Sequence, residues 1–122
     1  MTRILIGVMG PGERATRAER ETAFALGQRI AQQGWVLLTG GRAAGVMAAA
    51  SQGAHTAQGL VVGILPGEIP TNMSAAVDIP ILTGVGQARN AINVLSSQVV
   101  IACGWGAGTL SEIAFALKLG KP

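Results

Sequence analysis

Short apolar runs alternate with longer segments of helical pattern along the whole chain. Apolar runs of this length are typical of strands buried on both faces. They lie at residues 3–9, 35–39, 60–65, 78–82 and 98–103. The segments with a helical pattern lie at about residues 17–33, 44–57, 87–97 and 109–119. The alternation predicts an α/β fold, a Rossmann-like doubly wound parallel sheet with helices on both faces.

The length and composition of the chain suit one domain with one core. It has 122 residues, of which 49% are hydrophobic and 12% are charged. We expect residues 1–122 to form a single Rossmann-like ligand-binding domain. Lys121 and Pro122 come just where such a fold would place another buried strand. We therefore expect the natural polypeptide to continue with a final strand or helix.

The charge and the cysteine content narrow the class of partner. The formal net charge is +3, but the nine Lys and Arg residues form no cluster. This distribution argues against a nucleic-acid partner and favours an anionic small molecule. Glutamates alternate with Arg14, Arg17 and Arg20, which we interpret as a solvated helix face. Cys103 is the single cysteine, so we expect no internal disulfide and no cysteine-based metal motif. We also predict no protein-bound metal.

No part of the sequence indicates export or insertion into a membrane. The apolar run at residues 4–9 is too short for a signal peptide, and no uninterrupted run reaches transmembrane length. We therefore expect a cytoplasmic protein without membrane contact.

Two glycine-rich turns carry the strongest functional signal. Residues 39–47 read TGGRAAGVM and residues 104–112 read GWGAGTLSE, each between an expected strand and an expected helix. Such a turn presents backbone N–H groups to a phosphate, and parallel strands would bring both turns and residues 10–12 to one edge. The alternative is that these glycines only make tight turns. The spacing matches neither G-x-G-x-x-G nor the P-loop, so we expect no ordinary NAD or NTPase site.

Two arginines are candidate partners of the anion. Arg42 lies inside the first glycine turn, where it could clamp a phosphate with two hydrogen bonds or be a solvated turn residue. Arg89 lies in the opening turn of the expected helix at 87–97, in a stretch with few charges. An arginine in such a stretch needs a partner, which could be Glu112, a neighbouring subunit or an anionic ligand.

Glu112 and Trp105 each have two interpretations. Residues 109–112 read TLSE, which fits a capping box in which Thr109 and Glu112 bind the first free N–H groups of a helix. Alternatively, the Glu112 carboxylate lies beside the ligand, where it could bind a ribose hydroxyl or assist proton transfer. Trp105 could cover a flat ring system or pack under its loop.

The expected ligand site combines the three turns with these side chains. Its cofactor-binding residues are Gly10, Gly12, Gly40, Gly41, Arg42, Arg89, Gly106, Gly108, Thr109 and Glu112. If the protein is a hydrolase, Arg89 and Glu112 are its catalytic residues.

Both glycine segments resemble those of a known superfamily. Residues 40–50, GGRAAGVMAAA, resemble the GGGxxGxMxAxxxGA element of the LOG-like Rossmannoid proteins, which were long mislabelled as lysine decarboxylases. Residues 106–112, GAGTLSE, resemble the second half of their PGGxGTxxE element. The similarity extends from the first strand to Pro122.

Within that superfamily, the resemblance implies different functions for different branches. LOG-type phosphoribohydrolases release a cytokinin base from its nucleoside 5′-monophosphate, using an arginine–lysine helix and the glutamate of PGGxGTxxE. Here residues 104–106 read GWG and residues 88–91 read ARNA, so the surroundings of that arginine and glutamate differ. The GQARN and GTLSEIA segments look more like the molybdenum cofactor carrier proteins. Those form dimers or tetramers and bind and protect a pterin cofactor without known turnover.

The resemblance therefore implies a binding protein for a phosphate-bearing heterocycle, namely the molybdenum cofactor (molybdopterin), in a homodimer or homotetramer. It implies no protein ligand for molybdenum, because the dithiolene belongs to the cofactor. The alternative is a LOG-type phosphoribohydrolase that cleaves the N-glycosidic bond of nucleoside 5′-monophosphates. A nucleotide-sensing module is a third possibility.

Overall fold

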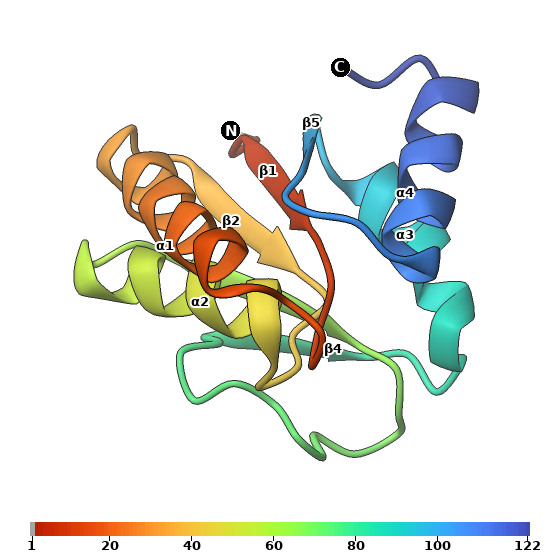
Figure 1. The fold of residues 1–122 in the computed structure, drawn as a ribbon, viewed down its shortest axis with the longest axis horizontal. Helices are drawn as coiled ribbons and strands as arrows, with labels where there is room; N and C mark the ends of the chain where they lie inside the picture. Colours follow the sequence, from red (N-terminus) through yellow and green to blue (C-terminus); the bar gives the residue numbers. More distant parts are fainter. Residues whose placement is uncertain (1) are drawn as a thin grey trace.

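Five parallel strands form one sheet with helices on both faces (Figure 1). The computed structural model describes residues 2–122. The strands are β1 (Leu5–Met9), β2 (Val36–Thr39), β3 (Val61–Leu65), β4 (Ile79–Leu82) and β5 (Val99–Ala102). They lie in the order β4-β3-β2-β1-β5, and each neighbouring pair is parallel. The α/β Rossmann-like fold predicted from the sequence is confirmed.

The helices of residues 2–122 form two pairs. They are α1 (Arg17–Gln32), α2 (Gly45–Thr56), α3 (Arg89–Ser96) and α4 (Ala107–Lys118), with a short 3₁₀ turn, η1 (Gly86–Ala88), leading into α3. α1 packs against α2 on one side of the sheet, and α3 packs against α4 on the other (Figure 1). None of these helices, in the part of the chain that the structure describes, is long and apolar enough to cross a membrane.

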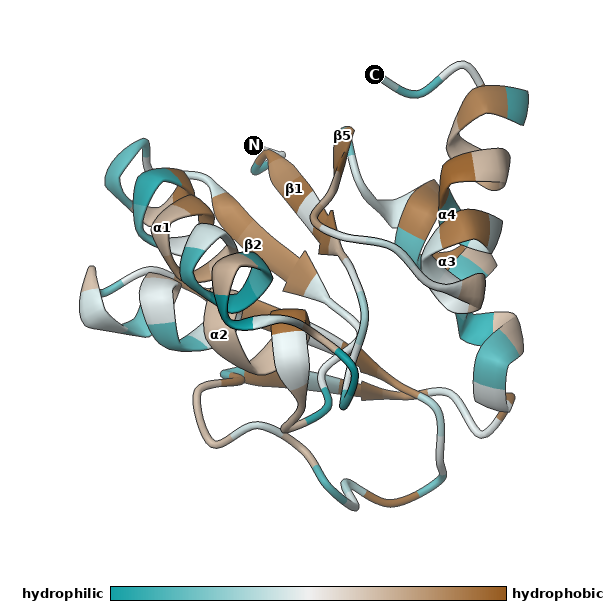
Figure 2. Cartoon of the chain, viewed as in Figure 1, coloured by the Kyte–Doolittle hydropathy of each residue, from teal (hydrophilic) through white to brown (hydrophobic). Residues whose placement is uncertain are grey.

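Alternate residues of the strands supply two apolar layers, as the pleat of a strand requires. Ile6 and Val8 of β1 belong to the larger layer, which α1 and α2 cover. Met9 belongs to a smaller layer with Leu38 and Ile64. Figure 2 shows that β1 and β2 are largely hydrophobic, whereas the outer surface of α1 carries hydrophilic residues. The centre of the sheet is therefore buried on both faces.

The ends of the elements differ from the expected ones by a few residues, and one difference matters for function. α4 begins at Ala107, two residues before its expected start. Gly106 is its N-cap, and the Gly106 carbonyl oxygen accepts a hydrogen bond from the N–H of Leu110 at 2.8 Å. Thr109 therefore lies inside the first turn of α4 and is not its N-cap.

Helices α1 and α2 touch through their backbones at two glycines. A Cβ atom on Gly27 would lie 2.0 Å from the carbonyl oxygen of Ala50, and one on Gly53 would lie 2.0 Å from that of Phe24. No carbon atom fits at this distance, so each helix needs glycine where it meets the other. The contact fixes α2 on α1, with the N-terminus of α2 at the carboxyl end of the sheet.

Gly27→Ala should destabilise the fold, because backbone atoms of α2 would have to move. Overpacking of this kind costs about 1–3 kcal/mol. Gly108→Ala is the matched control, since a Cβ on this helical glycine would come no closer than 3.8 Å, to Asn90 Nδ2. Chemical denaturation of both variants measures the difference, and equal stabilities would contradict the backbone contact.

Candidate functional site

A cleft opens at the carboxyl end of the sheet, where β1 and β5 lie side by side. The order of the strands reverses between these two, and ligands of open α/β sheets bind at such a point. The cleft has a volume of about 400 Å³. Its walls come from the loops after β1, β2 and β5 and from the first turns of α3 and α4. The three glycine turns therefore meet at one edge, as the sequence predicts.

The structure brings all but one of the expected site residues to this cleft. Those that line it are Gly10, Gly12, Gly40, Arg42, Arg89, Gly106, Gly108, Thr109 and Glu112. Gly41 is the exception, because its backbone groups are engaged elsewhere. Its N–H donates to Thr39 Oγ1 at 3.0 Å, and its carbonyl oxygen accepts from the N–H of Ser74 at 2.9 Å. This corrects the expectation for Gly41, which shapes the turn and offers no free N–H to the cleft.

Arg89 is the first residue of α3, and its own hydrogen bonds hold it in the wall of the cleft. Only 4% of the residue is exposed. Nε donates to the carbonyl oxygen of Ile64 at 2.9 Å, and Nη1 donates to Gln87 Oε1 at 3.4 Å. A Cβ on Gly40 would lie 3.1 Å from Nη2, so this end of the guanidinium group lies against the first glycine turn. Burial lowers the pKa of Arg89, and the charge of Glu112 opposes that shift.

Glu112 lies on the second turn of α4 and lines the same cleft. It is 6% exposed, and its Oε2 accepts a hydrogen bond from Asn93 Nδ2 at 2.8 Å. Burial raises the pKa of Glu112, while the Asn93 hydrogen bond and the charge of Arg89 act in the opposite direction. The carboxylate is therefore a buried hydrogen-bond acceptor in the cleft wall.

Of the two interpretations of Thr109 and Glu112, the capping box is wrong. Among the described residues, no side chain caps α4, because this helix begins before Thr109. A capping box of the same spacing forms at the start of α1, where the sequence analysis did not place one. There the Glu19 N–H donates to Thr16 Oγ1 at 3.1 Å, and the Thr16 N–H donates to Glu19 Oε1 at 2.8 Å.

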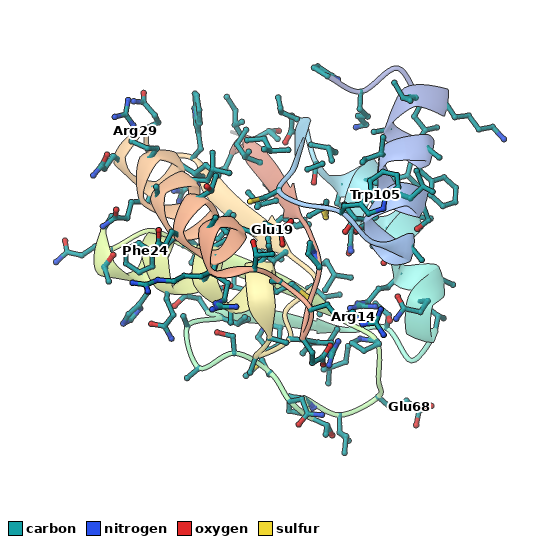
Figure 3. All side chains as sticks on the ribbon, viewed as in Figure 1. Arg14, Glu19, Phe24, Arg29, Glu68 and Trp105 are labelled. Carbon is teal, nitrogen blue, oxygen red and sulfur yellow. The ribbon has the colours of Figure 1, made fainter. Side chains whose placement is uncertain are left out.

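Arg42 and Glu13 form an ion pair on the rim of the cleft. Their side chains are 30% and 68% exposed. A backbone hydrogen bond and the Arg42 guanidinium group hold the pKa of Glu13 below its ordinary value. Exposed ion pairs contribute little free energy, so Arg42 can exchange Glu13 for an anion. Arg14 follows Glu13 in the loop after β1 and lines the cleft, because α1 begins only at Arg17 (Figure 3). The interpretation of Arg14 as part of a solvated helix face is therefore corrected.

Trp105 lies at the cleft in the loop between β5 and α4 (Figure 3). It is 70% exposed. It therefore does not pack under its loop, and the interpretation that remains is that its indole can cover a flat ring.

Asn90 and Asn93 complete the wall of the cleft, and sequence analysis did not single them out. They are 8% and 1% exposed, and Asn90 Nδ2 donates to Ser111 Oγ at 3.1 Å. They follow Arg89 by one and four positions, so the three side chains share a face of α3. This spacing of polar residues in an otherwise apolar helix is the signal by which they could have been found.

Comparison with known families decides where this chain belongs. The sequence profile of the SLOG cluster4 family matches residues 3–122. The chain belongs to the SLOG cluster4 family.

Relatives of this SLOG chain include proteins of known structure. A molybdenum cofactor binding protein from the phototrophic bacterium Rippkaea orientalis is 64% identical with a TM-score of 0.99, and the match covers 100% of this chain and 75% of that one. The molybdenum cofactor carrier protein from Chlamydomonas reinhardtii is 52% identical with a TM-score of 0.93, over 99% and 74% of the two chains. An uncharacterised protein from Archaeoglobus fulgidus is 48% identical over 119 residues, which are 95% of this chain and 75% of that protein. The resemblance to the LOG-like superfamily, and within it to the carrier branch, is confirmed.

Thr16→Ala should cost about 1 kcal/mol of stability, the usual effect of losing an N-cap hydrogen bond. Thr109→Val should leave the stability of this SLOG domain nearly unchanged, because Gly106 is the N-cap of α4. Urea denaturation of the two variants provides the comparison. A larger loss for Thr109→Val would restore the capping-box interpretation.

Glu112→Gln should stabilise the fold at neutral pH and have a smaller effect near pH 4. Burial raises the pKa of native Glu112, so on raising the pH the unfolded chain loses this proton before the folded chain does. As the pH rises, the free energy of unfolding of the unsubstituted chain therefore falls relative to that of the variant. The fall is about 1.4 kcal/mol for each unit by which the pKa is raised. Thermal unfolding at several pH values measures the difference between the two chains. A difference that stays constant with pH would contradict a raised pKa.

Proposed function

We propose that this chain binds and carries the molybdenum cofactor, a pterin with a terminal phosphate and an oxo-anionic metal centre. The observation that carries the proposal is a cleft lined by three strand-to-helix loops, in a chain 64% identical over its whole length to the Rippkaea protein. The cofactor is cargo here. Its own dithiolene holds the metal, so the protein need supply no ligand to molybdenum.

On this proposal, the glycine turns and Arg42 hold the anionic groups of the cofactor. Glycine allows close approach of the backbone, and a helix N-terminus favours negative charge. The residues in this role are Gly10, Gly12, Gly40, Arg42, Gly106, Gly108 and Thr109. Arg89 and Glu112 flank them from the buried part of the cleft.

We also propose that the protein is cytoplasmic and assembles as a homodimer or homotetramer. Apolar side chains on the second pair of helices support assembly: Leu95 of α3 is 59% exposed and Leu117 of α4 is 76% exposed. A second copy of the chain would remove such side chains from water.

Hydrolysis of the N-glycosidic bond of a nucleoside 5′-monophosphate is the second candidate function. One observation favours it: a carboxyl group with a raised pKa, Glu112, shares the cleft with the cation Arg89. In this reaction water adds to C1′ of the ribose, and the base leaves with the electron pair of the glycosidic bond and gains a proton. Glu112 would polarise the ribose, and Arg89 would neutralise the phosphate.

Protein purified from cells that make the cofactor should retain molybdopterin, which is detected by the fluorescence of its oxidised pterin. Arg42→Ala should lower the affinity for it about tenfold or more, because a hydrogen bond to a charged group contributes about 1.5–3 kcal/mol. Arg29→Ala is the matched control, since Arg29 lies in the last turn of α1, away from the cleft (Figure 3).

Incubation with AMP and cytokinin monophosphates, followed by chromatography, separates the two functions. The carrier should release no free base. Robust release of adenine from AMP would contradict the carrier function and support the hydrolase.

A further inference from the structure

The buried part of the cleft contains oxygen atoms that lack hydrogen-bond donors. Glu112 accepts from Asn93 Nδ2 through Oε2, whereas its Oε1 accepts no hydrogen bond from residues 2–122 and is not fully buried. Asn93 Oδ1 is the one buried side-chain polar atom of the described residues without a hydrogen bond. Both residues are more than nine-tenths buried and line the cleft. This region therefore presents acceptors to whatever enters it.

No cation contacts the Glu112 carboxylate in the part of the chain that the structure describes. The ion pairs found there are Arg17–Glu21 and Arg42–Glu13. Arg89 acts on Glu112 only through space, since its Nε donates to the Ile64 carbonyl oxygen and its Nη1 donates to Gln87 Oε1. The Glu112 carboxylate has one side-chain donor, Asn93, and N–H groups of a bound molecule would stabilise it further.

The charges along the cleft fix which end of a ligand meets Glu112. Arg42 lies on the rim against Gly12, where a Cβ atom would be 3.5 Å from its Nη1. A phosphate is attracted to Arg42 at the rim, whereas in the buried part the Glu112 carboxylate opposes the attraction of Arg89. The uncharged ring of the ligand, rather than its anionic group, therefore reaches Glu112.

This inference rests on the proposed function, in which the cargo contains a pterin. We propose that Glu112 binds the donor edge of a 2-amino-4-oxopyrimidine ring and that Asn93 positions the Glu112 carboxylate to do so. This edge has an amino group beside a ring N–H, two adjacent donors that match the two oxygens of a carboxylate. Each of these oxygens can accept two hydrogen bonds, so Oε2 keeps its bond to Asn93. Guanine presents the same edge, whereas hypoxanthine lacks its amino group. Glu112 thereby selects the class of ring that the cleft accepts.

GMP and IMP test this inference, because they differ only in that amino group. Isothermal titration calorimetry should show that GMP binds at least about tenfold more tightly than IMP, since a site built to hydrogen-bond a donor rejects the analogue that lacks it. Equal affinities, or no binding of either nucleotide, would overturn the inference.

Glu112→Gln gives a sharper test. A glutamine side chain offers one acceptor and one donor, so this variant should lose the preference for GMP and gain one for XMP, which has an oxo group in place of the amino group. Asn93→Ala should reduce the preference for GMP without creating one for XMP. If Glu112→Gln weakens GMP and IMP by the same factor, Glu112 contacts the ribose phosphate that they share, and the inference is wrong.

Glu13→Gln is the matched control, because it makes the same substitution on the exposed rim of the cleft. It should shift both affinities together and keep their ratio. The retention of molybdopterin is measured separately. A protein that retains molybdopterin but does not distinguish GMP from IMP refutes this inference alone, and one that distinguishes them but retains no molybdopterin refutes the carrier function alone.

Discussion

The wall of the cleft contains two buried groups of opposite charge, and each of them needs hydrogen-bond partners there. Arg89 and Glu112 are each less than a tenth exposed, and they come from different helices, α3 and α4. No ion pair joins them in the described chain. A neutral neighbour holds each one instead, the carbonyl group of Ile64 for the arginine and the amide of Asn93 for the glutamate. Their attraction acts across the interior, where it opposes the shift that burial causes in the pKa of each group.

The parallel sheet makes this arrangement a ligand site. All five strands point the same way, so the loops that follow β1, β2 and β5 end at one edge. Glycine lets these loops come close together: a Cβ atom on Gly10 would lie 2.3 Å from the carbonyl oxygen of Cys103. The loops after β1 and β5 are therefore held against each other, and the two walls of the cleft have a fixed separation.

Much of the fold follows from local signals, and the parts of the site that depend on packing do not. Apolar runs and glycine turns predict the strands and their common edge, because both are properties of short segments. The spacing of a capping box occurs twice, at 16–19 and 109–112, and only the point where each helix begins distinguishes them. Gly41 does not line the cleft because the loop at 66–78 folds back over it, and the Ser74 N–H donates to the Gly41 carbonyl oxygen. The contact of Asn93 with Glu112 joins two helices and depends on how α3 packs on α4.

The rim and the buried part of the cleft carry different polar groups, and this difference supports the proposed carrier function more than hydrolysis. Its rim holds Arg42, Arg14 and the exposed indole of Trp105, and its buried part holds Arg89 beside the acceptors on Glu112 and Asn93. On the inference above, a molecule that enters ring first satisfies those acceptors and leaves its anionic groups at the rim, where water can reach them. Hydrolysis would need the sugar at Glu112, so that the ring would lie away from these buried acceptors. On the proposed function, the carboxylate that would activate a sugar in a hydrolase holds a ring, which is later released unchanged.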